Sequence, residues 1–181
     1  MKRLVLLLLV ACCVPASAAV GENVITVGGR IGPLQIGKSG RADVIAYAGK
    51  PDAEVHERVL GFPSYDALGY ECSTKEASDT LSMGNDGPFC HTIFIVDVSS
   101  HTLEDFFTSD ARYRVDRGVR IGTPAATAQR LLRTKIDHNC LSVLKLDGGA
   151  ALLRVSFTGG KADAFALHSP NRTSGLFHCM A

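Results

Sequence analysis

Residues 36–50 read IGKSGRADVIAYAGK, and residues 121–135 read IGTPAATAQRLLRTK. Each stretch begins with Ile-Gly, continues with a hydroxyl residue and then becomes rich in alanine. Ser39 and Thr123 are placed to accept a hydrogen bond from a free amide in the first helical turn, which is the role of an N-cap residue. Pro124 follows at the first helical position, where its missing N–H has no consequence. The two stretches therefore predict two helices that begin alike, and they indicate an internal repeat.

The apolar positions predict which side of each helix is buried. They recur at helical spacing, at Ala42, Ile45, Ala46 and Gly49 in the first helix and at Ala128, Leu131 and Leu132 in the second. Gly49 followed by Pro51 is a strong signal for the end of the first helix. The alternative to a true repeat is chance, because any two capped helices look alike.

Short apolar or alternating runs predict strands after each helix. They cover 54–60, 65–72 and 91–98 after the first helix, and 142–146, 151–157 and 162–168 after the second. The Gly-Gly turns at 147–149 and 158–160 are typical of tight hairpins. We therefore expect an α+β fold of two tandem repeats, each with a helix packed on an antiparallel sheet. The domains would be a signal peptide at 1–18, a first unit at 19–110 and a second unit at 111–181.

The pattern Ile-Gly-x-Ser at 36–39, followed by Val44 and Gly49, resembles the repeat of the beta-lactamase inhibitory protein and of small outer-membrane assembly lipoproteins of the SmpA/OmlA type. In those proteins a similar stretch opens a helix that packs on an antiparallel sheet. The inhibitor is a tandem of two such units, each with a disulfide. The resemblance implies a two-unit protein whose role is protein binding rather than catalysis.

Residues 1–18 have the features of a targeting segment. A basic start at 1–3 is followed by an apolar stretch at 4–14, which is too short to span a bilayer stably but suits a secretory signal. The small residues at 16–18 suit a signal peptidase. We expect cleavage there and a secreted or periplasmic protein of bacterial origin. The alternative is a lipobox in which Cys12 is acylated and anchors the protein to a membrane.

Four cysteines remain after such cleavage, at Cys72, Cys90, Cys140 and Cys179. In an exported chain they predict two disulfides, with three possible connectivities. If the two halves are repeats, the pairing is local: Cys72 with Cys90, and Cys140 with Cys179. The alternative is a zinc site that includes the neighbouring His91, His138 and His178. A close Cys pair, typical of structural zinc, is missing from the sequence, so we expect no metal and no cofactor.

No catalytic signature is convincing in the sequence. Ser142 and Lys145 match Ser-x-x-Lys, and 38–40 match Lys-Ser-Gly, but their order is the reverse of that in penicillin-recognising enzymes. The sequence holds no Gly-x-Ser-x-Gly, His-Glu-x-x-His or Walker motif. Two histidines have acidic neighbours, namely His56 with Glu54 and Glu57, and His101 with Glu104 and Asp105. Exposed histidines beside acids are usually solvated, and we expect no catalytic residue.

Charge is distributed unevenly along a chain whose formal net charge is +1. Residues 43–110 hold thirteen acidic side chains against three basic ones, whereas 112–135 hold seven basic side chains against one acidic one. The basic segment begins with a binding stripe of four arginines, Arg112, Arg114, Arg117 and Arg120. Arg112 and Arg114 alternate with apolar residues, as in a strand with one apolar face. This stripe would meet an acidic protein or an anionic envelope polymer. Alternatively, the two halves neutralise each other across their own interface.

The composition, 46 % hydrophobic and 20 % charged over 181 residues, is that of a globular protein and excludes a disordered chain. It gives no reason to expect nucleic acid as a partner or a transmembrane segment after the signal. The sequence therefore predicts an exported, non-catalytic protein-binding or inhibitor-like module. The alternatives are a small exported hydrolase-like enzyme with a His/carboxylate site, or a lipid-anchored structural protein of the envelope.

Overall fold

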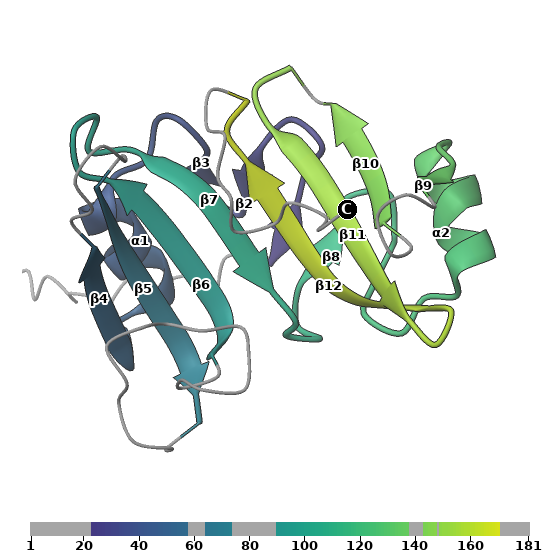
Figure 1. Ribbon diagram of the computed structural model, residues 1–181, viewed down its shortest axis with the longest axis horizontal. Coiled ribbons are helices and arrows are strands. Elements are labelled where there is room, and N and C mark those ends of the chain that lie inside the picture. The colour runs from purple at the N-terminus through teal and green to yellow at the C-terminus, as the bar shows by residue number, and fades with distance from the viewer. Residues whose placement is uncertain (1–22, 58–63, 74–89, 138–142, 148, 171–181) are drawn as a thin grey trace, which may run out of the picture.

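The computed structural model describes residues 23–57, 64–73, 90–137, 143–147 and 149–170. Within these residues the chain forms two helices, a long antiparallel sheet and a second small sheet (Figure 1). The strands of the long sheet, in spatial order, are β4 (Ala53–Glu57), β5 (Tyr65–Cys72), β6 (Cys90–Asp97), β7 (Leu103–Thr108), β12 (Lys161–His168), β11 (Leu152–Thr158), β10 (Val143–Asp147) and β9 (Ile136–Asp137). The expected mixture of helices and antiparallel strands is confirmed, and strands dominate it.

The two halves of the chain share the long sheet. Helix α1 (Arg41–Ala48) is followed along the chain by β4 to β7, and α2 (Ala125–Leu132) is followed by β9 to β12. Strands β7 and β12 meet at the centre, where Phe165 lies opposite Thr108 and His168 lies opposite Asp105. The sheet expected for each half is therefore, in the structure, part of one continuous sheet.

The small sheet was not expected, apart from its last strand. Its strands are β3 (Leu34–Gln35), β2 (Arg30–Ile31), β1 (Val24–Ile25) and β8 (Arg114–Val115), in that spatial order. Strands β1 and β8 pair in parallel, with Val24 opposite Arg114. This pairing fixes the segment before β8 against the start of the described chain, and the candidate site lies beside it.

The main core lies on one face of the long sheet. Phe94, Phe106 and Phe165 are fully buried there, and α1 and the small sheet lie behind that sheet in Figure 1. The same cluster includes Val44 of α1 and Leu132 of α2. The ring centroids of Phe94 and Phe106 lie 5.0 Å apart. The Tyr70 ring meets the Phe94 ring edge-on, with centroids 5.6 Å apart, an arrangement favoured by aromatic quadrupoles. This packing fixes the strands whose ends form the site.

Both predicted N-caps are wrong. The Ser39 hydroxyl accepts the backbone N–H of Gln35 at 3.0 Å, and the Thr123 hydroxyl accepts that of Arg120 at 2.9 Å. Each hydroxyl therefore closes the turn before its helix. The N-cap residues are Gly40 and Pro124, and neither makes a side-chain capping bond.

The predicted buried side of α1 is also wrong. Val44 is its buried residue and Tyr47 and Ala48 are partly buried, whereas Ala42 and Ala46 are exposed. The contrast between alanines and neighbouring apolar residues was too weak to fix the helix orientation. In α2 the burial of Ala128 and Leu132 is confirmed. Leu131, expected on the same side, is 37 % exposed.

The Cys72–Cys90 disulfide is confirmed, and it joins paired positions at the ends of β5 and β6. Because Cys90 is bonded to sulfur, it cannot serve as a zinc thiolate. Cys140 and Cys179, with their predicted disulfide, lie outside the described residues, as do His138, His178 and Ser142. The expected signal peptide at 1–18, including Cys12, lies outside them too. No helix in the described part of the chain is long and apolar enough to cross a membrane.

Candidate functional site

A pocket of about 340 Å³ opens beside the ends of α1, β5 and β6. Its lining includes three of the chain's four tyrosines, Tyr47, Tyr70 and Tyr113, and the charged residues Lys50, Asp52, Glu71 and Arg112. These residues come from three separate segments, which the core packing and the β1–β8 pairing bring together. Apolar rings combined with a few convergent polar groups are typical of ligand sites.

The chain turn after α1 supplies one wall of the pocket. Gly49 ends the helix with a φ of 87°, a conformation that glycine adopts without strain. The turn directs Lys50 and Asp52 to the pocket. The Asp52 carboxylate accepts the backbone N–H of Cys72 at 3.3 Å. The wall is thereby connected to the strand end that carries the disulfide.

The three tyrosines are protonated at neutral pH. Burial, with a smaller contribution from nearby Glu54, raises the pKa of Tyr70 to about 12. Burial also raises the pKa of Tyr113 and of Tyr47 above the ordinary value. The Tyr70 hydroxyl donates to the Gly49 carbonyl at 3.1 Å, and that of Tyr47 donates to Asn23 Oδ1 at 2.7 Å. These groups are therefore suited to hydrogen bonding and packing, not to acting as bases.

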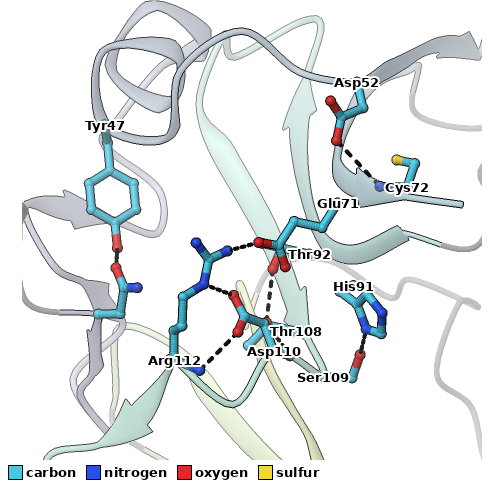
Figure 2. Close-up of polar contacts among 11 residues, drawn as sticks. Tyr47, Asp52, Glu71, Cys72, His91, Thr92, Thr108, Ser109, Asp110 and Arg112 are labelled. Atoms are coloured by element: carbon cyan, nitrogen blue, oxygen red, sulfur yellow. Dashed lines mark hydrogen bonds and ion pairs between the residues drawn. The ribbon is translucent and has the colours of Figure 1, made fainter.

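Arg112 stands between Tyr47 and Glu71 in the close-up of Figure 2. Its Nε donates to Asp110 Oδ2 at 2.7 Å, and its backbone N–H donates to Asp110 Oδ1 at 2.8 Å. A terminal nitrogen, Nη2, donates to Glu71 Oε1. The hydrogen bond with Asp110 is the main cause that raises the pKa of Arg112. Arg112 is therefore a permanent cation at the pocket, held from two directions.

Glu71 has an unusual backbone conformation for a strand residue. Its φ is 54°, in the left-handed region that a side chain with a Cβ adopts at an energetic cost. It directly precedes Cys72, whose disulfide anchors the strand end. Residues held in such conformations are enriched at ligand clamps and active sites. A strained backbone, an exposed ion pair and a pocket thus coincide at one residue.

Threonine and serine hydroxyls extend the polar contacts to the right of Arg112 in Figure 2. Thr92 and Thr108 share a buried hydrogen bond of 2.9 Å between their hydroxyls, and the backbone N–H of Asp110 donates to Thr108 at 3.1 Å. His91 lies 2.9 Å from the Ser109 hydroxyl. This network fixes the loop that carries Asp110 and Arg112.

Among the described residues that line the pocket, Arg112 is the one member of the binding stripe. Arg112 lines the pocket, whereas Arg117 donates to the carbonyl of Leu132 at the end of α2, at 3.1 Å. Arg114 and Arg120 face each other as bridge partners. The strand expected around Arg112 and Arg114 is only the two-residue β8. Tyr113, which directly precedes β8, and Val115 are both buried, as the alternation predicts. The alternation is broken because Ala111 and Arg112 belong to a turn.

The histidine–carboxylate pairs lie apart from the pocket lining. His56 is exposed and its Nδ1 lies 2.9 Å from Asp66 Oδ1 across β4 and β5, while the neighbouring Glu54 accepts from Arg41. Asp105, expected near His101, instead pairs with His168 at 2.8 Å in the buried centre of the sheet. This pair was not predicted, because its members are far apart along the chain. Among the described residues, no group of three His, Cys, Asp or Glu side chains could hold a metal ion.

Comparisons with known proteins give no family. No family model matches the chain, and no curated protein matches it. An uncharacterised protein, YfeY from Escherichia coli, is 15 % identical over 80 % of this chain and 98 % of its own, with a TM-score of 0.45. An extracellular protein containing an SCP domain, from Bacillus anthracis str. Ames, is 9 % identical over 75 % of this chain and 44 % of its own, with a TM-score of 0.40. The site is therefore interpreted from its own geometry.

Proposed function

We propose that the protein is an exported, non-catalytic module that binds an acidic partner protein through the pocket beside Arg112. The observation that carries this proposal is the Arg112–Glu71 ion pair, which stands at the pocket on a strained strand end. The Arg112 side chain is 62 % exposed despite this pair, so a partner can reach it. Guanidinium groups at such positions recognise carboxylates through two parallel hydrogen bonds.

The chemistry of the pocket favours binding over catalysis. Its tyrosines are phenols whose pKa lies above the ordinary value of 10.0, so they are neutral hydrogen-bond donors at neutral pH. Glu71 is held by Arg112, and Asp52 by the backbone of Cys72. Both carboxylates thus hydrogen-bond to the protein itself, an arrangement that suits a binding site.

Export is proposed from the targeting pattern at 1–18, and the Cys72–Cys90 disulfide supports it because such bonds persist in oxidising compartments. We further propose that 19–110 and 111–181 are tandem units. The order of elements supports this proposal, since each helix precedes four antiparallel strands. The resemblance to the beta-lactamase inhibitory protein agrees with a binding role.

The test is affinity capture from the native exoproteome or envelope on immobilised protein. Wild type should retain a specific protein that Arg112→Gln fails to retain. Arg130→Gln is the matched control, because Arg130 is exposed on α2 and takes no part in the pocket. Circular dichroism should first show that all three proteins are folded. Equal capture by wild type and Arg112→Gln would contradict the proposal.

A further inference from the structure

We propose that Glu71 is a built-in stand-in for a ligand carboxylate: it occupies Arg112 in the free protein and is displaced when a carboxylate enters the pocket. This inference rests on the proposed function, because it describes how the same pocket takes its ligand. It assigns Glu71 the role of an internal competitor.

The two carboxylates on Arg112 are held very differently. Asp110 is buried, with 8 % of its side chain exposed, and it contacts both the guanidinium and the backbone N–H of Arg112. Glu71 reaches Arg112 from another strand, keeps 43 % of its side chain exposed and makes a single contact with the guanidinium. Exposed ion pairs of this kind contribute little to stability. Asp110 is therefore the permanent partner and Glu71 the exchangeable one.

The backbone of Glu71 has a conformation that is found at clamps and switches. The left-handed φ of 54° is maintained next to a disulfide that fixes the following residue. Strain that the surrounding structure imposes is characteristic of clamps and switches. The left-handed backbone is thus a second feature, besides the exposed pair, that distinguishes Glu71 from Asp110.

Glu71 contacts Arg112 at the pocket, since both residues belong to its lining. Figure 2 shows the guanidinium between Glu71 and the Tyr47 ring. In the described part of the chain, Nη1 of Arg112 has no hydrogen-bond partner, so the fork can offer a carboxylate two parallel donors. Lys50 lines the same pocket and supplies a second cation. A carboxylate that replaces Glu71 would thus meet more donors than Glu71 does.

The experiment measures carboxylate binding by NMR chemical-shift titration of the disulfide-bonded protein. The probes are succinate and a short, end-blocked peptide with one glutamate, and the neutral comparator is the same peptide with glutamine. Glu71→Gln should bind the carboxylate probes about two- to fivefold more tightly than wild type, as expected when a competitor worth one exposed ion pair is removed. Glu54→Gln is the matched control, because Glu54 forms a comparable exposed pair with Arg41 outside the pocket lining.

The outcomes separate the two proposals. Tighter binding by Glu71→Gln but not by Glu54→Gln, with loss of binding in Arg112→Gln, supports the stand-in. Preference for succinate or for the peptide then identifies a free molecule or a protein as the source of the carboxylate. Unchanged or weaker binding by Glu71→Gln overturns the stand-in while leaving the pocket as a binding site. If Arg112→Gln binds the carboxylate probes as tightly as wild type does, the proposed function itself is contradicted.

Discussion

Tyr70 links the aromatic core to the pocket through one hydroxyl. Its pKa of about 12 lies above the ordinary value of 10.0 because burial favours the neutral phenol. A raised pKa in the folded state contributes stability that is complete below the ordinary pKa and is lost as the pH rises through the folded value. The fold should therefore weaken between about pH 10 and pH 12, because Tyr70 ionises in the unfolded chain before it ionises in the folded protein.

Tyr70→Phe tests this titration and keeps the ring in place. At neutral pH it should lose about 1 kcal/mol with the hydrogen bond to Gly49. Its free energy of unfolding should then fall less steeply than that of wild type above pH 10. Urea unfolding across this pH range, with ultraviolet absorbance of the phenolate, measures both effects. Identical absorbance titrations for the two proteins would contradict the assignment.

The sequence predicted Arg112 as a binding residue but not the residues that surround it in the pocket. Arg112 was found because it lies in a dense run of arginines, a feature visible in the chain itself. Tyr47, Tyr70 and Glu71 come from other segments and meet Arg112 only through the folded sheet. Three of the chain's four tyrosines line the pocket, but they are widely separated in the sequence and no local pattern connects them. The left-handed backbone of Glu71 is a property of the folded strand end and has no signature in the sequence.

Among the elements, β5 and β11 were predicted to within one residue, whereas β7, which carries a buried aspartate, was missed. The stretch at 65–72 matches β5, and 151–157 is within one residue of β11 at each end. Strand β7 was missed because Asp105 lies in it and looks like a surface residue. The partner that makes this burial favourable, His168, lies on the neighbouring strand β12. Pairing across the sheet thus overrides the local pattern.

The disulfide should stabilise the β5–β6 pair. It joins residues separated by 18 positions, and the loop-entropy model assigns about 3 kcal/mol to a loop of this size. Replacing both Cys72 and Cys90 by alanine should lower the free energy of unfolding by about that amount. Urea denaturation of the double variant against wild type measures the loss. A difference below about 1 kcal/mol would contradict a structural role for this bond.

The whole molecule should unfold as one cooperative unit, because the long sheet and the main core span both halves. Phe106 is fully buried on β7, the strand at which the halves meet. Phe106→Ala should lower the free energy of unfolding by about 3–5 kcal/mol. Leu131→Ala is the control, since a 37 % exposed leucine on α2 should change stability by less than about 1 kcal/mol.

Hydrogen exchange can show whether the two halves unfold together. In Phe106→Ala, amides of β5 and of β11 should lose protection by equal amounts, because both belong to the same cooperative sheet. Continued protection of β11 after β5 has become unprotected would indicate two independent units. Tyrosine fluorescence can follow the same transition, since the chain has no tryptophan.

The central pairing of β7 with β12 has a consequence for the nascent chain. A polypeptide made from its N-terminus can pair β4 to β7 long before β12 has been synthesised, because β12 is the last strand of the described order. Until then the N–H and C=O groups along one side of β7 lack their final partner. Unpaired strand edges of this kind recruit other chains. Translation that stops before residue 161 would therefore release a product prone to self-association.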